Sequence, residues 1–176
     1  MIYLTKKGLM NFKTIIILLI IFILTSISFL LILRIDLFVH TDLYSYGLEF
    51  TTLWANNYWY QKNMLLVFLV GSITLTVLSM IPHYDYSKKP TPISKWTGAL
   101  LPTISIIYLI FSISTFYKID DIIQNILPQF NLNVSYVWTS EYWNYSSITL
   151  SLMIVSLILL IIPTIRTSEI LEFELE

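Results

Sequence analysis

The chain contains no cysteine. A disulfide framework, a thiol nucleophile, an iron–sulfur cluster and a thiolate zinc site are therefore excluded. Charged residues make up only 12% of the 176 residues, whereas a soluble domain normally carries about a quarter. The net charge of -1 excludes the strongly basic surface with which proteins bind nucleic acid. With 56% hydrophobic residues and a mean hydropathy of +0.75, the chain needs a lipid bilayer as part of its solvent.

Four stretches without charged residues are long enough to cross a bilayer. At ~1.5 Å rise per residue, a run of about twenty residues matches the hydrocarbon core, which is about 30 Å thick. We expect transmembrane helices at about residues 14–33, 63–82, 97–117 and 147–165. The first is expected to be a retained span and not a cleaved signal peptide, because its apolar run is too long and no small-x-small site follows it.

The basic residues are divided unevenly between the two sides of this topology. One side has Lys6, Lys7, Lys13, Lys88, Lys89, Lys95 and Arg166, and the other has only Arg34, Lys62 and Lys118. The positive-inside rule places the first group in the cytoplasm. We therefore expect a multi-pass protein of the cell membrane with cytoplasmic N- and C-termini and two outer segments, at about 35–62 and 119–146.

The two outer segments match each other without a gap at an offset of 84 residues. Each begins with a basic residue, an isoleucine and an aspartate, which is Asp36 or Asp120. Each then contains a Trp-x-x-x-Tyr-Trp motif, formed by Trp54, Tyr58 and Trp59 in one copy and by Trp138, Tyr142 and Trp143 in the other. This register predicts an internal repeat.

The repeat predicts an all-α integral membrane fold made of two tandem helical hairpins. The first hairpin covers residues 1–90, with spans at about 14–33 and 63–82. The second covers residues 91–176, with spans at about 97–117 and 147–165 and an acidic cytoplasmic tail. Because two spans return the chain to the same side, the hairpins should be parallel and related by a pseudo-two-fold axis along the membrane normal. A small aromatic-rich helical cap is expected on the outer face.

Two interpretations apply to the candidate surface formed by both motifs and both aspartates. The aromatic rings are typical of an interfacial belt, but the duplicated spacing also suits a platform for a ligand or partner. The aspartates can each cap a helix that begins after the span, or they can share a cation across the pseudo-axis. The sequence alone leaves these alternatives open.

Catalytic and cofactor sites find little support in the sequence. Asp36 and His40 are spaced as helical metal ligands, but the second copy has Gln124 in place of the histidine, and two ligands do not hold a metal. A haem is excluded because His40 and His83 are expected on opposite sides of the membrane. None of the four expected spans contains an ionisable residue, which argues against ion-coupled transport. Small residues within the spans are expected where helices pack closely, and these are Ser26, Ser28, Gly71, Ser72, Ser105, Ser112, Ser114, Ser151 and Ser156.

We therefore expect no enzymatic activity, no cofactor and no metal. The leading hypothesis is a scaffold or accessory subunit of a membrane complex, which contacts the lipid bilayer and either a membrane protein partner or further copies of itself. The alternative is a protein that binds or permeates a lipid or small solute, with its site on the pseudo-two-fold axis beneath the outer aromatic cap.

Overall fold

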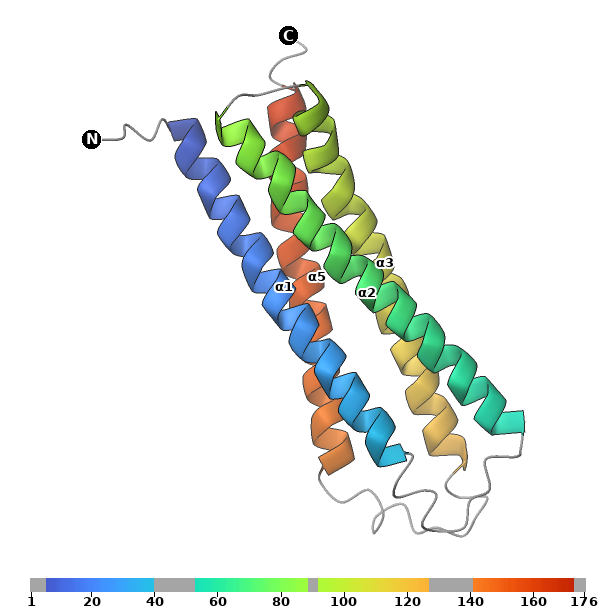
Figure 1. Ribbon diagram of the computed structural model, residues 1–176. Coiled ribbons are helices and arrows are strands. Elements are labelled where there is room, and N and C mark those ends of the chain that lie inside the picture. Colours follow the sequence, from blue (N-terminus) through green and yellow to red (C-terminus); the bar gives the residue numbers. More distant parts are fainter. Residues whose placement is uncertain (1–5, 40–52, 89–91, 127–140, 173–176) are drawn as a thin grey trace.

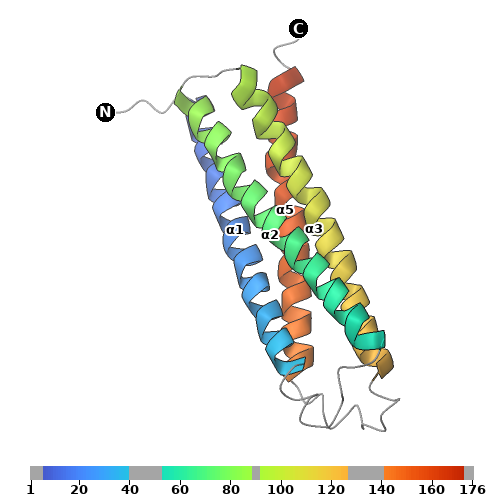
Figure 2. The same cartoon turned by 45° about the vertical axis from the view of Figure 1, so that its right-hand side comes forward.

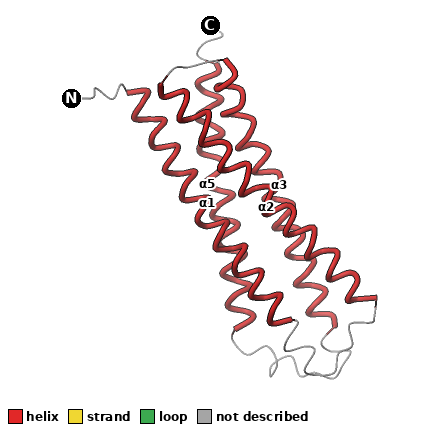
Figure 3. Tube along the Cα trace, viewed as in Figure 1, coloured by secondary structure: helices red, strands yellow, loops and turns green. Residues whose placement is uncertain are grey.

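Long helices form all of the architecture that the structure describes. The computed structural model describes residues 6–39, 53–88, 92–126 and 141–172. These residues form α1 (Lys6–Phe38), α2 (Leu53–Lys88), α3 (Pro92–Ile126) and α5 (Glu141–Glu172), which are the coiled ribbons of Figure 1. Figure 3 shows the same trace, coloured as helix throughout the described ranges. The predicted all-α class is confirmed.

The helices contain four candidate membrane spans. These are Phe12–Leu37, Asn57–Tyr84, Trp96–Asn125 and Asn144–Ile165. Each includes one of the spans expected from the sequence and extends beyond it, so the predicted number and position of the spans are confirmed. The helices themselves run for 32 to 36 residues, or about 50 Å, which is longer than the hydrocarbon core. Their ends therefore project past the lipid tails.

The four helices run alternately up and down in one elongated bundle (Figures 1 and 2). α1 and α3 each pack against both α2 and α5, and the contact between α2 and α3 is the most extensive. α1 and α3 end where α2 and α5 begin, and we name this the Asp36 end. The opposite end, where α2 ends and α3 begins, is the His83 end.

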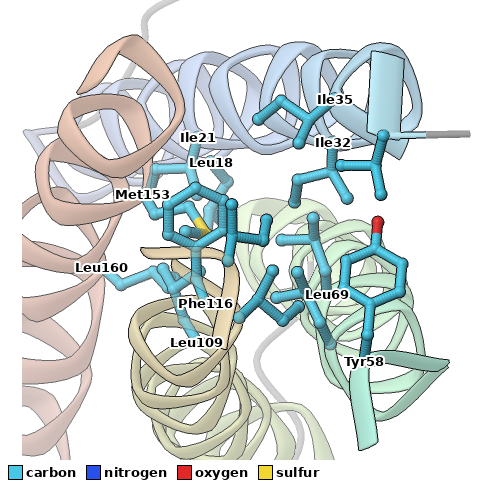
Figure 4. Packing of buried hydrophobic residues seen from close by; sticks show 14 residues of the cluster. Leu18, Ile21, Ile32, Ile35, Tyr58, Leu69, Leu109, Phe116, Met153 and Leu160 are labelled. Carbon is cyan, nitrogen blue, oxygen red and sulfur yellow. The ribbon is translucent and has the colours of Figure 1, made fainter. Parts of the chain in front are cut away.

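Buried side chains alternate at spacings of four and three residues along each helix. In α1 the buried positions are Thr14, Leu18, Ile21, Thr25, Ser28, Ile32, Ile35 and Val39, the last one residue beyond the helix. In α2 the series runs Tyr58, Lys62, Leu65, Leu69, Ser72, Thr76, Ser79 and His83. This is the heptad spacing of left-handed helix bundles. Figure 4 shows Leu18, Leu69, Leu109 and Met153, one from each helix, pointing into the space between the ribbons.

The outward faces are as apolar as the core. Only 28% of the most apolar window in α1 is buried, and nine large hydrophobic side chains of this helix are exposed. Exposed hydroxyls on these faces are satisfied within their own helix: Thr74, Thr103 and Ser151 each donate to the carbonyl four residues earlier, at 2.7 to 2.8 Å. Because lipid tails accept no hydrogen bonds, this arrangement suits a bilayer better than water.

Three helices contain a proline in their interior. Pro102 and Pro163 lie near the ends of the expected spans at 97–117 and 147–165, but α3 begins ten residues before Pro102 and α5 continues to Glu172. Pro82 also lies inside α2. All three prolines are buried. Transmembrane helices tolerate interior proline because neighbouring helices and local backbone adjustments satisfy the freed carbonyl groups.

Candidate functional site

A charged pair joins α1 to α2 at the Asp36 end. Asp36 lies in the last turn of α1, and its carboxylate accepts hydrogen bonds from the Tyr58 hydroxyl at 2.9 Å and from Lys62 Nζ at 3.1 Å. Tyr58 and Lys62 are four residues apart on α2, so one helix face presents both donors. The side chains of Lys62 and Asp36 are only 10% and 20% exposed. Both charged side chains are therefore largely buried within the bundle.

An aromatic ring covers the cation of this pair. Lys62 Nζ lies 3.6 Å from the centroid of the Trp59 ring, and this ring meets the ring of Tyr58 edge-on, with centroids 6.0 Å apart. A carboxylate on one side and a π face on the other both stabilise the ammonium group. We name Asp36, Tyr58, Trp59 and Lys62 the Asp36 cluster. Because its charges compensate each other, its chemistry suits the joining of helices better than the activation of a substrate.

The structure corrects the helix-capping interpretation of both aspartates. No helix starts at Asp36, since α1 continues through it to Phe38. Asp120 likewise lies within α3, which continues to Ile126, and it accepts a hydrogen bond at 2.8 Å from Gln124 one turn later. The sequence suggested caps because a basic residue appeared to end each span, but these helices continue beyond the lipid core. The Asp36 carboxylate is engaged with Lys62, which leaves it poorly suited to a shared cation site.

The structure describes only part of the predicted aromatic surface. Tyr58 is 1% exposed, so it belongs to the core and not to an outward platform, and Trp59 is partly buried. The side chains of Trp54, Tyr142 and Trp143, and Trp138 altogether, lie outside the described residues. Of the two expected outer segments, at about 35–62 and 119–146, residues 40–52 and 127–140 lie outside the described residues as well.

A hydroxyl cluster joins α2 to α3 near the middle of their spans. Ser105 Oγ lies 2.9 Å from Ser72 Oγ and 3.0 Å from Thr76 Oγ1, and the Ser105 hydroxyl is also 3.0 Å from the Ser72 carbonyl, to which it can donate. All three side chains are fully buried. The expectation of close packing is confirmed for Ser72 and Ser105, but it is wrong for Ser114 and Ser151, which are exposed. The hydrogen bonds between Ser72 and Ser105 require the tertiary register and could not be predicted from sequence.

Close packing accompanies this hydroxyl cluster. A Cβ atom on Gly71 would overlap ring carbons of Tyr108, so the absence of a side chain lets the two helices approach. The Tyr108 ring meets Phe68 edge-on, and Phe68 stacks on Phe111 with centroids 5.2 Å apart. The α2–α3 joint is thus held by polar and aromatic contacts together.

His83 is a buried residue that the sequence analysis placed just outside the second span. Its side chain is 4% exposed, and its Nε2 atom has no hydrogen-bond partner within the described part of the chain. The heptad series of α2 contained the signal, since His83 follows Ser79 by four residues. Across residues 6–39, 53–88, 92–126 and 141–172, no group of three or more His, Cys, Asp or Glu side chains could hold a metal ion.

Comparisons with protein-family models, with curated proteins and with solved structures found no match for this chain. Its class therefore follows from its own composition and helices. Four long apolar helices with lipid-compatible outer faces identify it as a multi-pass membrane protein with four candidate spans.

Proposed function

We propose that the protein is a non-enzymatic scaffold or accessory subunit of a membrane complex. The observation that carries the proposal is the filled interior of the bundle. Fourteen apolar side chains from the four helices form one buried cluster along it, and the Asp36 cluster neutralises its own charges. A bundle packed in this way offers its outward faces and its ends for contact. Those faces suit lipid and the transmembrane helices of other subunits.

An internal duplication is part of this proposal, and the pattern of burial supports it. Adding 84 to each buried position of α1 gives Gly98, Pro102, Ser105, Leu109, Ser112, Phe116, Ile119 and Ile123, all buried in α3. Adding 84 to the α2 series from Lys62 to Ser79 gives Ser146, Thr149, Met153, Ser156, Leu160 and Pro163, all buried in α5. A helix can bury any of its faces against a core, so two unrelated helices bury matching positions at a given offset only by chance. Matching burial in both helix pairs at one offset therefore favours duplication.

We further propose that both termini are cytoplasmic, so that the Asp36 end faces outward. Because the chain lacks cysteine, single cysteines report their own position without background. In intact cells, a membrane-impermeant maleimide should label Asn57→Cys at the Asp36 end and should leave Ile93→Cys unlabelled until the membrane is permeabilised. Both side chains are exposed, so burial does not explain a difference. The reverse pattern would place the termini outside.

The alternative proposal is a site for a lipid or small solute on the pseudo-two-fold axis, beneath the outer aromatic cap. The duplicated aromatic motif supports it, as does the rule that axial sites combine matching residues of both halves. Against it, the described length of the axis is occupied by buried side chains, including Leu69, Leu109 and Met153. A ligand there would have to displace them, and we therefore rank this function second.

Native mass spectrometry of the protein, extracted from its own membranes in mild detergent, separates the two functions. The scaffold proposal predicts a stoichiometric complex, either with a second protein or with further copies of the chain. A monomer that carries a defined lipid or solute would contradict it and favour the alternative.

A further inference from the structure

His83 Nε2 is an exception among the buried polar side-chain atoms of the described residues. It is the one such atom without a hydrogen-bond partner, and the side chain of His83 is buried. Ser79, the preceding polar residue on the same face of α2, donates to the carbonyl of Thr76 at 2.6 Å. A buried polar atom without a partner lowers the stability of a fold, and native proteins retain few of them. The unpaired nitrogen therefore indicates a group that the protein binds at this position.

His83 lies at the border between the apolar core and the lipid headgroups. It is the last but one residue of the candidate span Asn57–Tyr84, and it is the last buried position of α2 that the structure describes. The rings of Tyr84 on α2 and Trp96 on α3 are exposed at the same end of the bundle. Amphipathic aromatic rings are enriched at the depth of the headgroups. In a bilayer, the phosphate groups of the lipids therefore lie close to the depth of His83.

The sequence around the His83 end is basic on three of the four helices. Residues 6–13 and 83–95 contain six lysines and a single acidic residue, Asp85. These ranges include the start of α1, the end of α2 and the start of α3, and the side chain of Lys13 is exposed. Residues 166–176, which include the end of α5, contain four glutamates and one arginine instead. An anion is therefore favoured on the side of α1, α2 and α3, and His83 belongs to α2.

We propose that the His83 end binds a phosphate group. Nε2 of His83 donates a hydrogen bond to a phosphate oxygen, and the lysines at this end compensate the negative charge. The headgroup of an anionic phospholipid and free phosphate share this chemistry. Because Nε2 is enclosed, the phosphate displaces the side chains that cover it. The site lies at the opposite end from the expected outer aromatic cap, and it is independent of the scaffold function.

Nuclear magnetic resonance of the histidine nitrogens tests this proposal on the full-length chain in detergent micelles. The chain has two histidines, so isotopic labelling of histidine gives two sets of side-chain signals, and His40→Gln identifies those of His83. We expect dioleoyl-phosphatidylglycerol to shift the Nε2 signal of His83 saturably, and dioleoyl-phosphatidylcholine, which has no net charge, to shift it far less. A saturable shift with inorganic phosphate alone would identify free phosphate as the ligand. No shift with either anion, or an equal shift with phosphatidylcholine, would overturn the proposal.

The variant His83→Leu shows whether the imidazole itself binds the phosphate. Leucine has a similar volume and leaves no unpaired nitrogen, so the variant should unfold in SDS mixed micelles no more readily than the wild type. Its affinity for phosphatidylglycerol, titrated by native mass spectrometry, should fall about tenfold, which corresponds to the loss of a hydrogen bond to a charged group. A histidine with a purely structural role would give lower stability and unchanged affinity, and this result would contradict the proposal.

Two lysine variants test the part played by charge at the His83 end. Lys13→Gln removes an exposed cation there and should weaken the binding of phosphatidylglycerol about fivefold. Lys118→Gln removes an exposed cation at the Asp36 end and should leave the affinity unchanged. If both variants weaken binding equally, the lipid responds to the total charge of the protein and not to a site at the His83 end, and the proposal is wrong.

Discussion

Replacing Asp36 with asparagine is expected to lower the free energy of unfolding by about 2 kcal/mol, because it leaves a buried cation without its counter-charge. The Lys62 side chain is 10% exposed, and only the uncharged asparagine amide and the Trp59 ring would then face its ammonium group. The loss should stay below the value for a fully buried pair, since a lysine at the border of the apolar span can extend toward the headgroups. Unfolding by SDS in mixed micelles, followed by circular dichroism, measures the change.

Two further variants show whether the effect belongs to the pair. Asp36→Asn combined with Lys62→Met removes both charges and should recover most of the stability, because an apolar replacement of a buried pair is often neutral. Asp121→Asn removes a carboxylate from an exposed position of α3 and should change stability by less than about 0.5 kcal/mol. If the double variant is as unstable as Asp36→Asn alone, the loss comes from the contact with Tyr58 and not from charge.

The Asp36 cluster also shows which features of this fold could be predicted from the sequence and which could not. Uncharged runs correctly predicted four spans, because the length of an apolar helix must match the bilayer. The same reasoning treated Lys62 as a residue at the border of the second span and Tyr58 as part of the aromatic surface on the outer face. In the bundle both lie on the buried face of α2, which begins at Leu53, nine residues before Lys62. Charge marks the border of the lipid core, but it does not mark the end of a helix.

The sequence also could not show which residue each of the two aspartates contacts. The predicted duplication suggested that Asp36 and Asp120 have equal roles. In the structure Asp36 contacts Lys62 of α2, and Asp120 accepts a hydrogen bond from Gln124 on its own helix. At the offset of 84 the position of Lys62 is taken by Ser146, and the contact between Lys62 and Asp36 requires the antiparallel register of the helices. The heptad spacing of buried residues is present in the sequence. It is hard to recognise there, because many buried positions are serine or threonine and most of the outward positions are apolar as well.

Gly71→Ala is expected to destabilise the bundle by about 1 to 3 kcal/mol, the usual range for overpacking a close contact. The new methyl group would overlap carbons of the Tyr108 ring. That ring cannot turn away freely, because Phe68 meets it edge-on with centroids 5.9 Å apart. Helix propensity acts in the opposite direction, since alanine is favoured over glycine by about 1 kcal/mol within a helix. The measured loss is therefore smaller than the steric effect itself.

The chain provides matched controls for this prediction through its offset of 84. Val155→Ala changes the equivalent position of α5, where a side chain is already present, and should have little effect on stability. Combining Gly71→Ala with Tyr108→Leu gives α3 the residue that α1 has at the equivalent Leu24, and should relieve the overlap. Unfolding in SDS mixed micelles compares the three variants. If Gly71→Ala is as stable as the wild type, the ring of Tyr108 shifts without a loss of stability. The close approach at Gly71 would then not explain why the α2–α3 contact is the most extensive in the bundle.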